Sequence, residues 1–252
     1  MPLAMSSKSD LESNGTRLNL PEDLSELLDS AVSLRLVGSI AEMAALALGG
    51  QGADSHEVVY KLPDGNEVLE ATVARVRNGI VVNYPEPYMR RRDPDTMVIA
   101  DDKPTDKPRY RERFGKEFGP LRRETFDWLA AQDLVVVPFH AGRHGMGLDA
   151  IAVLPLNAAF FGCALGLLQG FIPPDKIPKN FSPRAVIYIA PPFRHTHFGG
   201  KQVVVHHRGD PVHEMFCFNL YPGPSAKKGI YGILIDLGEA EGWVTAHCST
   251  VR

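Results

Sequence analysis

Apolar residues along the chain alternate between a helical spacing and spacings typical of strands. From Leu24 to Leu36 they recur three or four residues apart, which predicts a helix that begins at Pro21. A second short helix is expected over residues 41–48, because Gly49 and Gly50 follow it directly. Two helices are therefore expected before the first strand.

The next part of the chain has the pattern of a small antiparallel sheet. Residues 58–62 and 68–76 are strand-like and flank Pro63-Asp-Gly-Asn66, which predicts a β-hairpin. A third strand is expected over 80–84 and a short one over 96–100. Residues 101–119 are charged and contain proline, so they are expected to form a surface excursion.

Helices and strands alternate from Leu121 onward. Helices are predicted over 121–132 and 157–170, the second with Asn157 as its N-cap. The predicted strands are 134–139, 149–154, 185–190, 202–206 and 214–220. Strands separated by helix-sized segments favour an α/β protein with a mixed β-sheet flanked by helices. Residues 1–20 are expected to be a flexible tail and 21–252 a single domain.

Residues 151–172 are almost entirely apolar and roughly long enough to span a bilayer. Pro155, Asn157, Gln169 and several glycines interrupt them. A strand followed by a buried helix therefore explains this run better than a transmembrane helix does, and no membrane partner is expected.

Composition excludes several classes of protein. The net charge of −3 gives no basic excess, so a nucleic-acid partner is not expected. Cys163, Cys217 and Cys248 are scattered, without a Cys-x-x-Cys pair, and indicate neither a zinc site nor a disulfide framework. The N-terminus lacks the apolar region of a signal peptide. A cytoplasmic protein with reduced thiols is therefore expected.

Several polar motifs have both a functional and an ordinary explanation. The glycines at 142, 145 and 147 do not have the spacing of a nucleotide loop, which favours a simple glycine turn. Arg90-Arg-Arg92 could bind a carboxylate or phosphate, or form a solvated basic loop. His195 with His197, and the pair His206-His207, could ligate a metal or be loop histidines without a special role.

The C-terminal stretch contains a second set of candidate metal ligands. Lys227 and Lys228 are adjacent, and His247 follows them. A lysine amine binds a metal only when it is deprotonated, and a neighbouring ammonium and burial both lower its pKa from about 10.4. A metal site and a surface lysine pair both remain open on these residues alone.

Two motifs in this stretch resemble those of the ATP-type phosphoenolpyruvate carboxykinases. Lys227-Lys-Gly-Ile-Tyr-Gly-Ile-Leu234 and Gly242-Trp-Val-Thr-Ala-His-Cys-Ser249 are similar to that family's Lys-Lys-Gly and Met-His-Cys-Ser-Ala-Asn motifs, at closely similar spacing. Other segments resemble the family in the same order: 92–99 its substrate loop, 134–139 and 148–173 its strand and strand–helix segments, and 216–220 its Val-Ala-Phe-Asn-Leu strand. The resemblance covers residues 75–252 at low identity.

The resemblance implies a fold, a reaction and a set of residues. The fold would be that of the family's N-terminal domain, and the reaction a decarboxylation and phosphoryl transfer on a small dicarboxylate or phosphorylated substrate. A divalent metal (Mn²⁺ or Mg²⁺) would be required, together with ATP or GTP bound by the protein's own C-terminal nucleotide-binding domain. The implied residues are Lys228 and His247 for the metal, Arg91 and Arg92 for the substrate, and Tyr221 and Lys227 for catalysis.

This sequence departs from the family at several positions. The segment Tyr221-Pro-Gly-Pro-Ser-Ala226 is one residue longer than the family pattern and lacks its acidic residue. Asp93 and Asp95 stand where the family has a serine and a lysine. The chain also ends before the family's P-loop would begin, so it is expected to be the N-terminal part of a longer, divergent protein, inactive alone. Two alternatives stay open: a binding or regulatory domain without chemistry, and a kinase-like protein with another phosphoryl acceptor.

Overall fold

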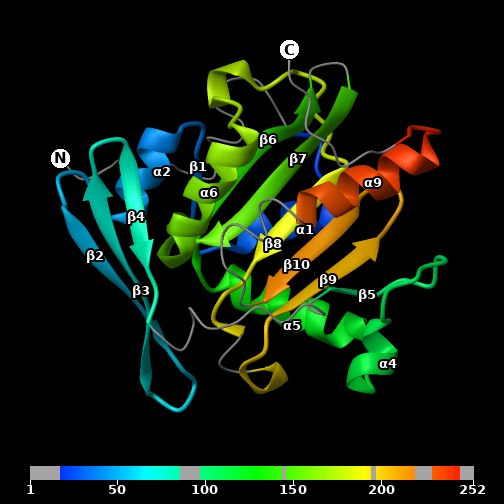
Figure 1. The fold of residues 1–252 in the computed structure, drawn as a ribbon, viewed down its shortest axis with the longest axis horizontal. Helices are drawn as coiled ribbons and strands as arrows, with labels where there is room; N and C mark the ends of the chain where they lie inside the picture. The colour runs from blue at the N-terminus through cyan, green and yellow to red at the C-terminus, as the bar shows by residue number, and fades with distance from the viewer. Residues whose placement is uncertain (1–17, 86–96, 144–145, 194–196, 219–228, 245–252) are drawn as a thin grey trace.

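A computed structural model describes residues 18–85, 97–143, 146–193, 197–218 and 229–244. Within these residues the chain forms a seven-stranded sheet with helices on both faces and, beside it, a three-stranded sheet (Figure 1). The predicted mixed α/β sheet flanked by helices is therefore confirmed. Outside the strands and helices detailed below, short 3₁₀ turns are formed by Leu156–Ala158, Pro174–Lys176 and Phe198–Gly200.

The large sheet has the strand order β1-β6-β7-β8-β10-β9-β5. Its strands are β1 (Ser33–Leu36), β5 (Met97–Ile99), β6 (Asp133–Arg143), β7 (Met146–Pro155), β8 (Ala185–Ile189), β9 (Val203–Arg208) and β10 (His213–Phe218). The pairs β6–β7 and β9–β10 are antiparallel, and the other four pairs are parallel. All five residues of the central strand β8 are buried, because helices cover both faces of the sheet.

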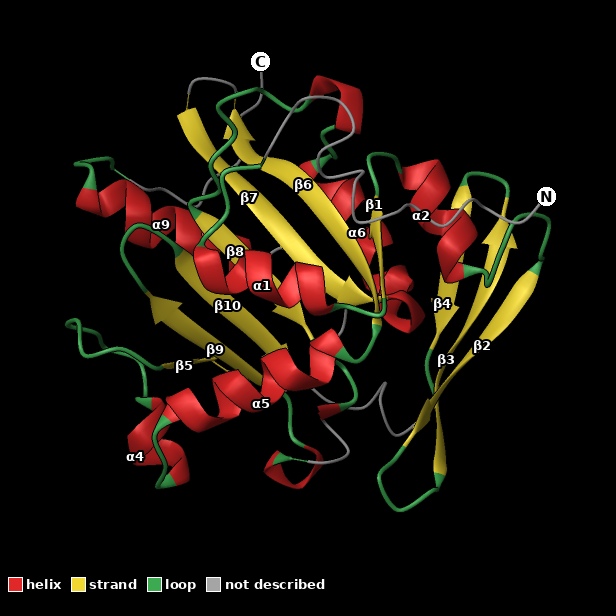
Figure 2. Ribbon diagram, turned by 180° about the vertical axis from the view of Figure 1, so that it is seen from behind, coloured by secondary structure: helices red, strands yellow, loops and turns green. Residues whose placement is uncertain are grey.

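Side-chain alternation divides the core between the two faces of this sheet. Val135 and Val137 belong to one apolar cluster, whereas Val136 belongs to the other. On the first face, the cluster includes α2 (Ile40–Ala47), α6 (Ala159–Gln169) and α9 (Ile230–Ala240). On the second face, it includes α1 (Glu22–Ser30), α4 (Tyr110–Phe114) and α5 (Phe118–Ala130), as Figure 2 shows from behind.

The three-stranded sheet is antiparallel and consists of β2 (Ser55–Lys61), β3 (Glu67–Val76) and β4 (Gly79–Asn83). It confirms the predicted hairpin and third strand. Val58, Tyr60 and Val73 are buried in the same cluster as α2, so the small sheet packs beside that helix. The predicted helix over 41–48 is confirmed as α2, whose N-cap Ser39 accepts a hydrogen bond from the Glu42 backbone N–H.

Two predictions about helix ends are wrong. The helix predicted from Leu24 to Leu36 ends at Ser30, and Leu36 belongs to strand β1, where it alternates with Leu34. The two leucines fit a period of two as well as the helical spacing, and the parallel pairing with β6 decides in favour of a strand. Asn157 does not cap α6, because it lies inside a 3₁₀ turn and the helix begins at Ala159 without a side-chain cap.

The excursion predicted over 101–119 is also more structured than expected, because it contains α4 and the first two residues of α5. The glycine turn predicted after Phe139 falls within the β6–β7 hairpin, whose register continues to Arg143 and Met146. The apolar run 151–172 forms the end of β7 and helix α6, as expected. In the described part of the chain, no helix has both the length and the apolar character needed to cross a membrane.

Candidate functional site

The β9–β10 hairpin presents polar side chains to both faces of the large sheet. His206 and His207 are neighbours on β9, so their side chains point to opposite faces. His206 contacts His213 on the α9 face, whereas His207 contacts Glu214 on the α5 face. Both histidines therefore lie on a strand and not in a loop, as the strand predicted over 202–206 implies for His206.

A chain of two imidazoles and a carboxylate lies on the α9 face. Nδ1 of His206 is 2.8 Å from Nε2 of His213, and both side chains are almost completely buried. Nδ1 of His213 lies 3.3 Å from Oδ2 of Asp236, which α9 carries across the sheet. The two atoms are close enough for an ion pair, but the geometry does not meet that of a hydrogen bond. The Asp236 carboxylate still favours a proton on His213 Nδ1, because a lone pair there would face its negative charge.

This arrangement determines the tautomers of both histidines. In its neutral tautomer with the proton on Nδ1, His213 accepts at Nε2, so His206 donates from Nδ1. The remaining nitrogen of His206, Nε2, then carries a lone pair. It is buried and has no hydrogen-bond partner among the described residues. Burial lowers the pKa of His206 to about 3, so its imidazole stays neutral at physiological pH.

Asp236 and Arg208 complete the polar side of this cluster. Arg208 Nη1 is 3.6 Å from Asp236 Oδ1, and its Nη2 is 2.7 Å from Asp101 Oδ1. The close contact with His213 holds the pKa of Asp236 below its usual value, with a further contribution from Arg208. Asp236 therefore stays ionised and keeps the imidazole chain oriented.

A cavity of about 720 Å³ opens beside His206, His213 and Asp236, between β5, β9 and α9. Most of its lining is apolar, including Met97, Ile99, Ile230, Leu234 and Ile235, and His206, Arg208, His213 and Asp236 supply polar groups. In the part of the wall that the structure describes, the cations Arg208 and Lys107 are each paired with an aspartate. The wall therefore has the size and character of a small-molecule site, without a free cation for an anionic ligand.

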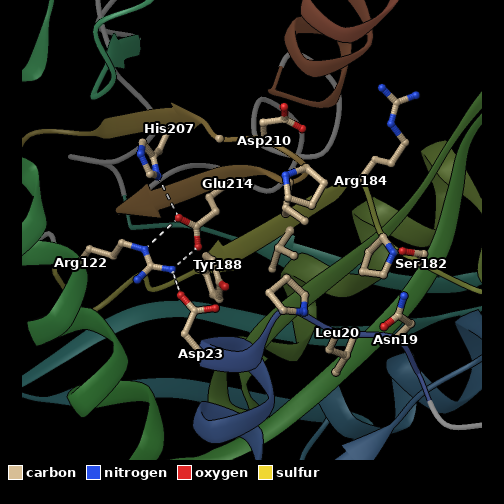
Figure 3. A pocket seen from close by; sticks show the side chains of 16 residues that line it. Asn19, Leu20, Asp23, Arg122, Ser182, Arg184, Tyr188, His207, Asp210 and Glu214 are labelled. Carbon is tan, nitrogen blue, oxygen red and sulfur yellow. Dashed lines mark hydrogen bonds and ion pairs between the residues drawn. The ribbon is translucent and has the colours of Figure 1, made fainter.

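The α5 face of the same hairpin carries a closed ion network (Figure 3). Arg122 donates from Nε and Nη2 to the Glu214 carboxylate, at 2.8 and 2.7 Å, and from Nη2 to Asp23. His207 Nδ1 lies 3.0 Å from Glu214 Oε2. Burial raises the pKa of Glu214, but hydrogen bonds from His207 and Arg122 outweigh it and give a net lowering. A pocket of about 380 Å³ adjoins the network, whose carboxylates are already paired.

The six residues implied by the family resemblance lie outside the described residues: Arg91, Arg92, Tyr221, Lys227, Lys228 and His247. Met97 comes directly after the segment 86–96, which contains Arg91 and Arg92, and Ile230 comes shortly after the segment 219–228, which contains the two lysines. Both Met97 and Ile230 line the cavity under α9. Val244, which precedes the segment of His247, is almost fully exposed. Within the described ranges, no group of three or more histidine, cysteine, aspartate or glutamate side chains is arranged for a metal ion.

His195 also lies outside the described residues, and its predicted partner His197 contacts Glu124 at 2.9 Å and stacks on Phe193. The sequence analysis missed His213 and Asp236. The alternation in β9 and β10 is visible in the sequence and places His206 and His213 on one face, but Asp236 joins them only through the packing of α9.

Comparison with curated proteins of known function finds no significant match. A family model described as "Domain of unknown function (DUF4914)" matches residues 20–252 and thus includes the β9–β10 hairpin and α9. The match covers nearly the whole chain, and the chain therefore belongs to the DUF4914 family.

Proposed function

We propose that the chain is the substrate- and metal-binding part of a nucleotide- and divalent-metal-dependent phosphotransferase or decarboxylase similar to the ATP-type phosphoenolpyruvate carboxykinases. The ordered motifs between residues 75 and 252 support this proposal. One structural observation carries it: Met97 and Ile230, which follow the segments of Arg91-Arg92 and Lys227-Lys228, line the same cavity. The described residues that come after these two segments, far apart in sequence, thus adjoin one cavity.

In this proposal each residue outside the described ranges has a role taken from the resemblance. Arg92, with Arg91, binds the carboxylate of a small dicarboxylate or of a phosphorylated product, because a guanidinium binds such groups bidentately. Lys227 and Tyr221 contact the reacting group. The nucleotide, ATP or GTP, binds to a C-terminal nucleotide-binding domain.

Lys228 and His247 are the proposed metal ligands, since the described residues do not form a metal site by themselves. Asp236 is not available as a ligand, because Arg208 and His213 already occupy its carboxylate. A bound Mn²⁺ or Mg²⁺ would stabilise negative charge that develops on the substrate. We place the protein in the cytoplasm; the described cysteines, Cys163 and Cys217, are both buried free thiols.

Mn²⁺ titration of the 252-residue chain, followed by electron paramagnetic resonance of the free ion, tests the ligand assignment. Lys228→Ala and His247→Ala should each weaken Mn²⁺ binding by about tenfold or more, because each removes a ligand. The matched control is Lys201→Ala, which changes an exposed lysine. Equal affinities in all four proteins would refute the assignment.

Binding of phosphoenolpyruvate in the presence of Mn²⁺ tests the substrate side. Arg92→Gln should weaken it, whereas Arg123→Gln, an exposed arginine on α5, should leave it unchanged. Binding that is insensitive to Arg92 would contradict the dicarboxylate proposal but not the metal ligands.

A second candidate function keeps the phosphoryl transfer and changes the acceptor. The cavity wall favours it, because Arg208 and Lys107 are each paired with an aspartate and most of the lining surface is apolar. A neutral acceptor molecule bearing a hydroxyl group fits this wall better. In an assay of the longer protein with Mn²⁺ and labelled ATP, label transfer to a hydroxyl compound but not to oxaloacetate-derived product would favour this candidate.

A further inference from the structure

His206 presents an unsatisfied hydrogen-bond acceptor beside a cavity whose surface is mostly apolar. Buried polar atoms nearly always have partners, because an unpaired buried acceptor costs roughly 1–3 kcal/mol. His206 Nε2 is buried and lacks a partner among the described residues, and the whole side chain is only 2% exposed. The atom therefore marks a position at which a donor from outside the described structure would be stabilised.

The direction of the imidazole chain decides what kind of group this is. Asp236 favours a proton on His213 Nδ1, and His213 Nε2 in turn receives the proton of His206 Nδ1. His206 Nε2 is left as an acceptor, not a donor. Such an atom attracts a hydroxyl group and repels the oxygen atoms of a carboxylate or phosphate.

The surroundings of His206 define the rest of the ligand. Its Cε1 atom, bonded to Nε2, faces Gly232 of α9, where an added Cβ would lie 3.7 Å away and would also meet Met97. Both residues line the cavity of about 720 Å³, which is within the usual range for small-molecule sites. Apolar side chains from β5 and α9 form most of the wall, and they would contact an apolar ligand body.

We propose that this cavity binds an uncharged small molecule with an apolar body and one hydroxyl group, which donates its hydrogen bond to His206 Nε2. His213 and Asp236 are positioning residues, because they hold the tautomer and do not need to touch the ligand. The inference rests on the second candidate function, whose acceptor it defines, and it disfavours a dicarboxylate in this cavity. Binding requires neither the metal nor the nucleotide, so a failure of binding is distinguishable from a failure of phosphoryl transfer.

The test uses two fluorescent probes of similar shape on the unmodified 252-residue chain. 2-Naphthol has an apolar body and a hydroxyl donor, whereas 2-methoxynaphthalene has the same body and can only accept. 2-Naphthol should bind about tenfold more tightly, the difference that one hydrogen bond to a buried acceptor provides. Equal affinities, or no binding of 2-naphthol, would overturn the proposal.

Two further measurements locate the contact. Long-range ¹⁵N–¹H correlation spectra should show His206 protonated at Nδ1 alone, with an Nε2 resonance that shifts on addition of 2-naphthol. A proton on Nε2 in the free protein would refute the mechanism. His206→Phe should abolish the preference for 2-naphthol, whereas His56→Phe, at an exposed histidine, should keep it. If His206→Phe retained the preference, the donor would bind elsewhere and the proposal would fail.

Discussion

His206 should make the folded protein sensitive to acid, because its imidazole stays neutral where an exposed histidine is protonated. In the unfolded chain its pKa is near 6.5, whereas in the folded protein burial lowers the pKa to about 3. Between these values the unfolded state binds more protons than the folded state does. Stability therefore falls as the pH drops through this window.

The magnitude follows from the two pKa values. At pH 7 the imidazole is mostly neutral in both states and contributes little. At pH 5 it is protonated almost completely in the unfolded chain alone, which favours unfolding by about 2 kcal/mol relative to pH 7. The titratable and charged groups that face it are His213 on β10, Arg208 on β9, Asp236 on α9 and Asp101 after β5. The pairing of these two aspartates with Arg208 and His213 leaves neither carboxylate free for an imidazolium.

Urea unfolding at pH 7 and pH 5 measures this loss in the free energy of unfolding. His206→Gln removes the titrating group, keeps a polar side chain at the position, and should reduce the loss of stability between the two pH values by about 2 kcal/mol. His56→Gln is the control, since it removes an exposed histidine. The reasoning is refuted if His206→Gln loses as much stability between the two pH values as the unmodified protein.

Three further outcomes are expected. Arg122→Leu leaves the buried Glu214 carboxylate without its main partner. It should lower the free energy of unfolding, measured by urea titration, by about 3–5 kcal/mol, whereas Arg123→Leu, at an exposed arginine, should change it little. Gly232→Ala meets only ordinary van der Waals contacts and should raise the melting temperature, since alanine stabilises a helix interior by about 1 kcal/mol over glycine. Burial raises the pKa of the Cys163 thiol to about 12. In a Cys248→Ser background, this thiol should therefore react with a disulfide reagent only after the protein unfolds. Rapid labelling of the folded protein would contradict its burial.

Local patterns in the sequence predict most of the strands but not their order. The run from Leu134 to Phe139 is apolar throughout because both of its faces are covered, and this is visible in the sequence alone. Strand β1 is missed, because Leu36 also fits the helical spacing of the residues before it. Only pairing with β6, a contact across a long stretch of chain, makes it a strand.

The candidate site could be predicted only in part for the same reason. Alternation along β9 places His206 and His207 on opposite faces, which is a local property. Their partners depend on the β9–β10 register, which sets His207 against Glu214 and leaves His206 diagonal to His213. Asp236 reaches His213 only because α9 packs over the sheet, and no spacing in the sequence encodes that distance.

The two faces of the β9–β10 hairpin differ in how their polar groups are satisfied. On the α5 face, Glu214 accepts from Arg122 and His207, and its network connects β10 to α1, α5 and β9. On the α9 face, the chain of partners stops at His206 Nε2. A closed network of this kind stabilises the strands that carry it, and the register it maintains on one face also keeps His206 against His213 on the other. The ion network therefore serves the cavity indirectly, because it stabilises the pairing of the two strands that carry His206 and His213.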